Sequence, residues 1–176
     1  LNTALAEDGL LIEAPEGAVL DAPLHLVFVH SAGNTGSSYL RHKIECRENS
    51  RLTVIEHHRG GGNGLSNDLW HVHMKPNAQL RHLRVQNAGS AHTAFSRCDA
   101  VIAGDALYTR LDIDTGGHYQ RLELNLALQG RNALARSGGP GLPSVASLPS
   151  RSPPLGLRPP PGIVARLLPC LSPCPP

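Results

Sequence analysis

The sequence predicts an all-β protein in which parallel strands coil into a solenoid, each coil stacked on the one before. Two observations predict this fold: a short phrase recurs at a nearly constant step, and the segments between its copies alternate apolar and polar residues. No segment keeps a convincing 3.6-residue apolar period, as an amphipathic helix would. Strands that return at a fixed step without crossover helices indicate one rung for each repeat.

The recurring phrase is a turn residue, a small residue, any residue and then Leu. Its copies are residues 17–20, 49–52, 77–80, 104–107 and 131–134. The last two copies are imperfect, because their small residue directly precedes the Leu. The steps between Leu20, Leu52, Leu80, Leu107 and Leu134 are 32, 28, 27 and 27 residues. We expect these leucines to stack in a common interior, with the small residue clearing the bend at one corner.

The segments between the phrases have the period-2 alternation of strands with one buried face. We expect the interior to receive Leu107, Thr109, Leu111, Ile113, Leu122, Leu124, Leu126 and Leu128. The stretch from Leu24 to Val29 is apolar apart from His25, as for a strand covered on both sides. An antiparallel sandwich with coincidental spacing is the alternative.

The chain divides into two regions by composition. Twelve of its 15 prolines follow residue 136, in a stretch with no Asp, Glu or Lys. We expect a folded core over 1–136 and a Pro-rich tail over 137–176 that is disordered or arises from a change of reading frame. Because the chain begins at Leu1 rather than Met, we also expect its natural N-terminus to be missing.

Charge and cysteine content exclude several classes of protein. Residues 1–136 carry 13 basic and 14 acidic side chains, so they offer no basic surface for nucleic acid or an anionic membrane. Cys46 and Cys98 stand alone, and the spacing of Cys170 and Cys174 suits no common zinc site. We therefore expect a reducing, cytoplasmic setting, with no signal peptide and no membrane-spanning segment.

Two groups of residues resemble metal or phosphate sites. His71 and His73 place two imidazoles on one strand face, as in a cupin-like metal-binding barrel, but no carboxylate follows them. The simpler interpretation puts both on the wetter face, with Trp70, Val72 and Met74 in the core. Residues 60–64 are a glycine-rich segment without the Lys-Ser/Thr of a phosphate-binding loop, so we expect a solenoid loop.

Asp112 and Asp114 share one strand face and could form the paired acids of a polysaccharide-acting β-helix enzyme. Their neighbours Arg110 and Tyr108 favour a solvated face instead. We therefore assign no catalytic, cofactor-binding or metal-binding residue. Two imidazoles at His57 and His58 point to opposite faces of a strand, and the remaining histidines are expected mainly at the surface, with one or two in the core.

Three phrases resemble the core of the SufB/SufD proteins of iron–sulfur cluster assembly. They are residues 51–56, residues 77–80 leading to 82–86, and residues 121–124 leading to 128–133. The opening residues 1–5 and 8–9, before residues 23–26, are more similar to SufD than to SufB. The resemblance covers about 1–136.

This resemblance implies a right-handed parallel β-helix, here a partial one, and a non-catalytic scaffold subunit rather than an enzyme. It implies a SufB-like paralogue and a SufC-like ATPase as partners, with the iron–sulfur cluster assembled by the full complex and no cofactor bound by this fragment alone. The family's terminal helical regions and the rest of its β-helix have no counterpart, so no ligand or SufC contact is carried over. A solenoid ending in unpaired strand edges is expected to be marginally stable or prone to aggregation.

Overall fold

The computed structural model describes residues 2–6, 8–31, 35–139, 144–147 and 164–167. Apart from the short helix α1 (Asn2–Leu5), the regular elements are strands. They are β1 (Leu11–Ala14), β2 (Leu24–His30), β3 (Ser37–Cys46), β4 (Arg51–Gly60), β5 (Leu65–Met74), β6 (Gln79–Ala88), β7 (Thr93–Ala103), β8 (Leu107–Asp114), β9 (Tyr119–Gln129), β10 (Leu134–Gly138), β11 (Ser144–Ser147) and β12 (Val164–Leu167).

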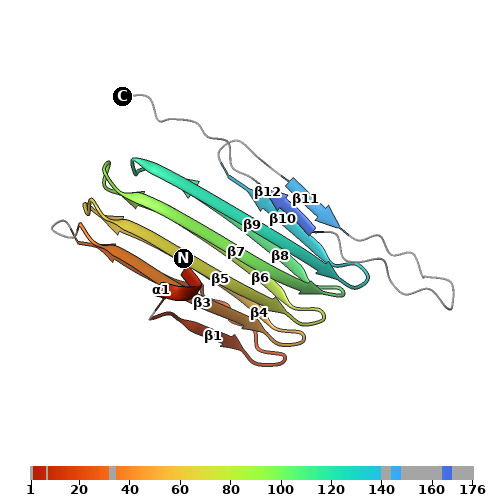
Figure 1. Cartoon of the computed structure of the whole chain (residues 1–176). Helices are drawn as coiled ribbons and strands as arrows, with labels where there is room; N and C mark the ends of the chain where they lie inside the picture. Colours follow the sequence, from red (N-terminus) through yellow and green to blue (C-terminus); the bar gives the residue numbers. More distant parts are fainter. Residues whose placement is uncertain (1, 7, 32–34, 140–143, 148–163, 168–176) are drawn as a thin grey trace.

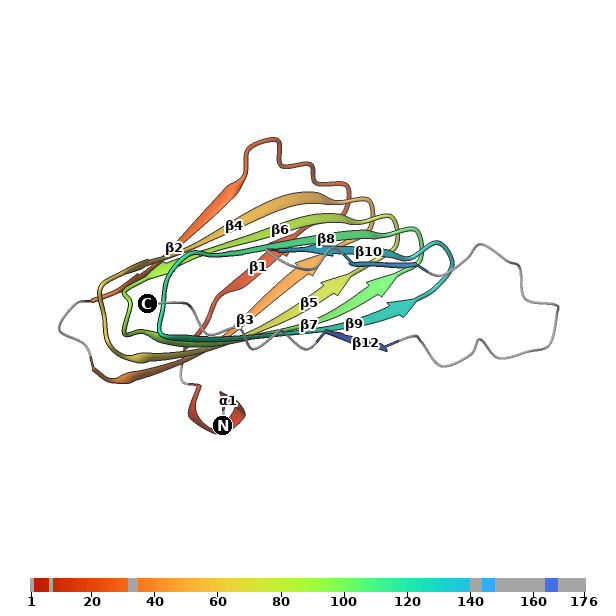
Figure 2. The same cartoon turned by 90° about the horizontal axis from the view of Figure 1, so that it is seen from above.

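The strands form two sheets that face each other, as Figure 2 shows. Sheet A has the order β1-β3-β5-β7-β9-β12, and sheet B has the order β11-β10-β8-β6-β4-β2. From β1 to β10 every pairing within a sheet is parallel, whereas β11 and β12 add antiparallel strands at one end. The predicted parallel solenoid is confirmed, and the antiparallel sandwich is wrong.

Each rung is one strand of sheet A followed by one strand of sheet B, joined by a tight turn (Figure 1). Odd-numbered strands lie in sheet A and even-numbered strands in sheet B from β3 to β10. Wider loops return the chain to sheet A on the opposite side. The rungs therefore stack directly, and residues 28 or so apart in the sequence become neighbours across a hydrogen-bonded ladder.

The tight turns share one left-handed residue. It is Gly17, Asn49, Asn77, Asp105 and Asn132 in successive turns, with φ between 58° and 68°. The turns stack through their backbones, because the N–H of Asn49 donates to the carbonyl of Pro76 and that of Asn77 to the carbonyl of Gly104. Asn and Gly tolerate this conformation better than other residues do, and the short polar side chain of Asp shares that tolerance.

The repeat is real, but its predicted alignment is wrong in the last two copies. The turn residues there are Asp105 and Asn132, one position later than expected. The small residues Ser50, Ala78, Ala106 and Ala133 then form one fully buried column at the corner, as predicted. The inward position two residues further on is held by Leu52, Leu80, Tyr108 and Ala135.

Leu107 and Leu134 therefore do not enter the interior. They pair with Gln79 and with each other in an outward row, and Leu20 is largely exposed. Only Leu52 and Leu80 of the five recurrent leucines are buried. The cause is that the turn residue, rather than the Leu, sets the register of each rung, and a shift of one residue reverses the direction of every side chain in a strand.

The interior changes character from one side to the other. Near the tight turns it is apolar, with side chains from both sheets that include Ile44, Leu52, Val72, Leu80, Ile102, Leu126 and Leu128. Toward the wide loops the buried side chains are polar or charged, among them Glu56, His58, Asp68 and Arg84. The sequence predicted an interior packed mainly with aliphatic residues and one or two buried histidines, so this polar half is a finding.

The strand β2 differs from prediction in another way. Its outward side chains Val27 and Val29 are 62% and 72% exposed, so the strand is covered on one face only. The helix α1 lies against sheet A, where the side-chain amide of Asn2 donates to the carbonyls of Leu40 and Asn67. Among the described residues no helix is long or apolar enough to cross a bilayer.

The Pro-rich stretches of the predicted tail, 148–163 and 168–176, lie outside the described residues. So do Cys170 and Cys174. The boundary expected at residue 136 falls within β10, and the division into a core and a tail stays a prediction.

Candidate functional site

The polar half of the interior is organised around Glu56, in the middle of β4. Its carboxylate is fully buried. Trp70 Nε1 and His58 Nε2 approach its Oε2 at 3.1 and 3.2 Å, and Arg110 Nη1 lies 3.3 Å from its Oε1. His82 Nε2 also contacts Oε1. Strands β4, β5, β6 and β8 thus meet at one carboxylate, which can accept all four N–H groups.

Glu56 is ionised in this setting. Burial alone would raise the pKa of its carboxyl, but the contacts with His82 and Arg110 and the hydrogen bonds from both histidines hold that pKa well below its usual range. Burial, reinforced by Arg110, lowers the pKa of His82, which favours the neutral ring. The network then assigns Nδ1 of His82 as the acceptor of the Arg110 Nη1 hydrogen bond at 2.9 Å.

Arg110 joins Glu56 to a second carboxylate, that of Asp112. Two positions apart on β8, Arg110 and Asp112 point to the same face, and Nη2 lies 2.7 Å from Oδ1 while Nε lies 3.0 Å from Oδ2. Burial opposes the charge of Arg110, but Asp112 and Glu56 outweigh it and raise the pKa of the guanidinium. The arrangement is a buried, bidentate ion pair.

The predicted orientation of β8 is therefore wrong. Tyr108, Arg110 and Asp112 face the interior, and Leu107, Thr109, Leu111 and Ile113 face outward. The alternation was correct, but alternation does not say which face is buried. The same prediction for β9 is confirmed, since Leu124, Leu126 and Leu128 are in the core. Asp112 is engaged by Arg110 inside the solenoid, and Asp114 pairs with Arg84 at 2.8 Å, so these acids do not present a pair to a sugar polymer.

A second polar group lies nearer the wide loops. His58 Nδ1 and Asp68 Oδ2 are 4.0 Å apart, and Arg84 donates to Gln86 at 3.3 Å. Burial raises the pKa of Asp68 to about 6, more than the nearby His58 and Arg84 lower it. Asp68 is thus the one carboxyl of this half, among the residues the structure describes, whose surroundings are shown to favour the protonated form.

The described cysteines are both buried and protonated. Burial raises the pKa of Cys46 to about 12 and that of Cys98 to about 11. Cys98 Sγ lies 3.4 Å from the hydroxyl of Tyr108, which in turn lies 3.2 Å from His82. Because the thiolate is the form that attacks electrophiles and binds metals, neither thiol is prepared for such chemistry in this state.

The histidine pair of β5 lies on the outer face of sheet A. His71 is half-buried and His73 exposed, while Trp70, Val72 and Met74 are buried as predicted. In the part of the chain that the structure describes, no three His, Cys, Asp or Glu side chains are grouped to hold a metal ion. Four histidines are fully buried, more than expected: His42, His58, His82 and His92.

The glycine-rich segment serves the stacking of the rungs. A side chain at Gly60 would meet the carbonyl oxygen of His30 at 2.1 Å, and φ there is 125°. Only glycine permits such a close approach of two backbones. Residues 61–63 are irregular and connect β4 to β5, so the predicted loop is confirmed.

The sequence contained a signal for the polar interior that a search for aligned leucines misses. Glu56, Arg84 and Asp112 follow one another at 28-residue steps, as do His82 and Arg110. Polar residues that recur at the repeat length form a column of stacked side chains. Such a column can lie inside the solenoid as readily as on its outer surface. Deciding between the two requires the register of the turns.

Comparisons with known proteins give one family and one partial relative. The family model described as "SUF system FeS cluster assembly, SufBD core domain" matches residues 28–142. A curated protein, the argininosuccinate lyase of Hyphomonas neptunium, is 41% identical over 64 residues, which are 36% of this chain and 14% of that protein. No solved structure matches.

Proposed function

Because this chain belongs to the SufBD core family of SUF iron–sulfur cluster assembly, we propose that it is a non-catalytic scaffold subunit of that system. The observation that carries the proposal is the extent of the family match. It runs from β2 through β10 and so coincides with the stacked rungs rather than with one motif.

The chemistry of the interior supports a scaffold role. The carboxylates of Glu56 and Asp112 are engaged by Arg110, and the thiols of Cys46 and Cys98 are held protonated by burial. Such groups do not attack a substrate, but a buried network that joins four strands fixes their register. A rigid platform is what a subunit needs when it holds other subunits in place.

The finer proposal names the subunit and its partners. We infer a SufD-like subunit that pairs with a SufB-like paralogue and acts with a SufC-like ATPase in the cytoplasm. The chain alone holds no cofactor in this proposal, and the cluster is assembled by the complex. The resemblance of residues 1–5, 8–9 and 23–26 to SufD supports this choice over SufB.

Co-purification tests the proposal. The 176-residue chain with an affinity tag should retain a co-expressed SufB-like protein and, through the assembly, a SufC-like ATPase. The same chain expressed alone should contain no iron or acid-labile sulfide after anaerobic reconstitution and removal of excess iron. Recovery of the tagged chain without either partner, or a stoichiometric cluster on the chain alone, would contradict the proposal.

A further inference from the structure

The outer faces of the two sheets differ in how their charges are paired. On sheet A most outward charges of β3, β7 and β9 are paired, for example Lys43 with Glu45 at 2.7 Å and Arg97 with Asp99 at 2.9 Å, and Arg41 is an exception. On sheet B the outward positions of β2, β4, β6, β8 and β10 carry no Asp or Glu. They carry four arginines: Arg51, Arg59, Arg81 and Arg136.

Between these arginines lies an apolar stripe. One of its rows runs across the strands through Ile55, Leu83 and Leu111, and the next row runs through Val27, Val85 and Ile113. His25 and His57 interrupt the two rows as a stacked pair with 2.9 Å between Nδ1 and Nε2. We call these two rows the sheet B stripe. The outer face of sheet A has no such stripe, because its outward rows mix charged, polar and apolar residues.

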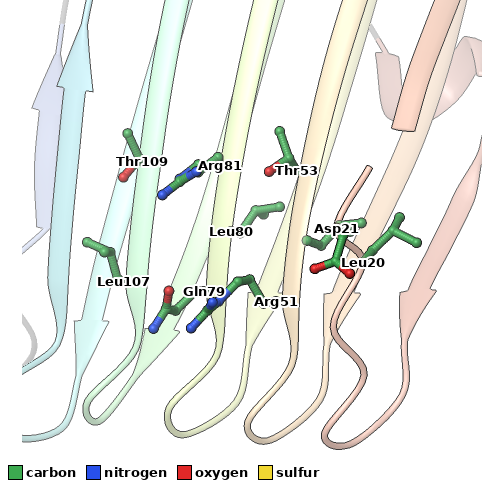
Figure 3. Close-up of a pocket in the computed structure, with 10 residues that line it drawn as sticks. Leu20, Asp21, Arg51, Thr53, Gln79, Leu80, Arg81, Leu107 and Thr109 are labelled. Atoms are coloured by element: carbon green, nitrogen blue, oxygen red, sulfur yellow. The ribbon is translucent and has the colours of Figure 1, made fainter. Parts of the chain in front are cut away.

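The arginines border the stripe on both sides. Arg81 and Arg136 occupy the row next to Ile55 and Leu83, Arg51 lies one row further out, and Arg59 lies beyond the opposite edge. Figure 3 shows the first side, where Arg51 and Arg81 line a hollow of about 230 Å³ together with Gln79, Thr53 and Thr109. Asp21, from the loop before β2, is the carboxylate at its edge.

The dimensions of this surface fit one kind of occupant. Rows on the same face of a strand are roughly 7 Å apart, so two apolar rows with their margins are about as wide as a helix, roughly 10 Å. The two rows cross the four strands β2, β4, β6 and β8. At about 4.8 Å spacing these strands give the stripe a length of about 14 Å, which is the length of about 10 helical residues. A helix lying across the strands would reach arginines along both of its flanks.

We propose that the outer face of sheet B docks an amphipathic helix of another protein, with aliphatic side chains on the sheet B stripe and Asp or Glu along its flanks. Charge complementarity selects this occupant: the outward strand positions carry four arginines and no carboxylate, and Asp21 at the edge offers only one negative charge against them, so an acidic partner is favoured. A two-fold pair of identical faces would instead set arginine against arginine. This inference goes beyond the scaffold role and does not depend on it.

A designed peptide tests the proposal on the full 176-residue chain. The peptide has about 14 residues, with Leu at i, i+3, i+4 and i+7 and Glu beside them, and a control peptide has Lys in place of Glu. Amide chemical shifts should change in β4, β6 and β8 at outward positions and stay constant in sheet A. The Lys peptide should bind at least about tenfold more weakly than the Glu peptide, and added salt should weaken the binding of the Glu peptide.

Variants locate the surface. Leu83→Gln should weaken the binding of the Glu peptide about tenfold, and so should the double change Arg59→Glu, Arg81→Glu. The control variants Val101→Gln and Lys75→Glu, which lie on other surfaces, should leave this binding unchanged. A circular dichroism melt of each variant separates lost binding from lost folding. Equal binding of both peptides, or shifts confined to sheet A, would overturn the proposal. So would self-association abolished by Leu83→Gln, or binding to phosphatidylglycerol vesicles without binding to the peptide.

Discussion

A buried carboxylate is costly to place in a protein interior unless strong donors surround it, and Glu56 has four of them. Three come from strands other than its own, so the charge is compensated only when β4, β5, β6 and β8 are in register. The residue therefore links side-chain chemistry to the order of the rungs. Its contribution lies in specifying one stacking arrangement rather than in raw stability.

Replacement of Glu56 should be much more damaging than replacement of a surface glutamate. Glu56→Gln leaves Arg110 and the two histidines without an anion, and we expect the free energy of unfolding to fall by about 3 kcal/mol. Glu45→Gln, which disrupts an ion pair with Lys43 on the outer face, should have little effect. Urea unfolding followed by Trp70 fluorescence compares them, and similar losses would refute the role given to Glu56.

Replacement of Asp68 should have the opposite effect and stabilise the fold. Its pKa is about 6 in the fold and 3.8 in the unfolded chain, so ionisation opposes folding as pH rises through that window. Asp68→Asn should leave stability unchanged below pH 4 and raise it above pH 6 by on the order of 2–3 kcal/mol. For Asp99, whose pKa is lowered by Arg97 and Asn125 against the effect of burial, the same change should not stabilise at any pH.

The buried histidines make the chain sensitive to acid. Burial lowers the pKa of His30 and of His42 from 6.5 to about 4. Between pH 6.5 and 4 the unfolded chain therefore takes up protons that the fold excludes, and stability falls as pH falls. In this pH range a fully buried histidine lowers the free energy of unfolding by about 1.4 kcal/mol per pH unit, and the partly exposed His30 lowers it by less.

The response of Asp68 partly offsets this loss below pH 6. Thermal melts from pH 8 to 4 should show the midpoint falling below pH 6.5, with a shallower fall in His42→Gln. A midpoint that is constant over that range, or that rises as pH falls, would contradict the burial of neutral histidines.

At the level of the element, the tight turn sets the register. Asn77 has φ of 59°, a conformation that Ala adopts at a cost of about 1 kcal/mol and Gly adopts freely. Asn77→Ala should therefore destabilise the chain by about that amount, and Asn77→Gly much less. Asn87→Ala, in an exposed extended position on β6, is the matched control for the lost amide. An equal loss of stability in Asn77→Ala and Asn87→Ala would show that the left-handed conformation of Asn77 is not the cause, and would contradict the role given to the turn.

The turn also explains which strands could be predicted from the sequence. The phrase at residues 49–52 and 77–80 gave the correct stacking, because there the turn residue and the Leu are at their usual spacing. In the copy that ends at Leu107, the turn residue Asp105 is only two positions before the Leu. Aligning leucines moved β8 by one residue and reversed its faces, and the turn's backbone dihedral angles and the strand pairing in the structure reveal that error.

The polar interior was beyond prediction for a related reason. Period-2 alternation shows that a strand has two faces, but the buried face is identified by hydrophobicity only when the other face is polar. On β8 the aliphatic residues point outward to the sheet B stripe and the charged ones inward to Glu56. Both faces of β8 thus run against the expectation that apolar residues are buried and charged residues exposed. Glu56, the carboxylate that β8 meets inside, lies on β4, 54 residues before Arg110 in the sequence.

For the whole molecule, these features describe a solenoid with an internally braced core and two unlike outer faces. Most of the described outward charges of sheet A are paired, and sheet B has an apolar stripe bordered by four arginines with no carboxylate on its strands. A platform of this kind suits a subunit that must present a fixed surface to other proteins. Family membership places that platform in iron–sulfur cluster assembly.

The most direct test of this account is the register of the stacked rungs in solution. In nuclear Overhauser spectra of the isotope-labelled chain, Leu80 side-chain protons should contact the ring of Tyr108 and the methyl groups of Leu52, while those of Leu107 should contact Leu134. Contacts between the side chains of Leu80 and Leu107 would instead show the leucine-aligned register, which places Arg110 and Asp112 outside and leaves Glu56 buried without Arg110.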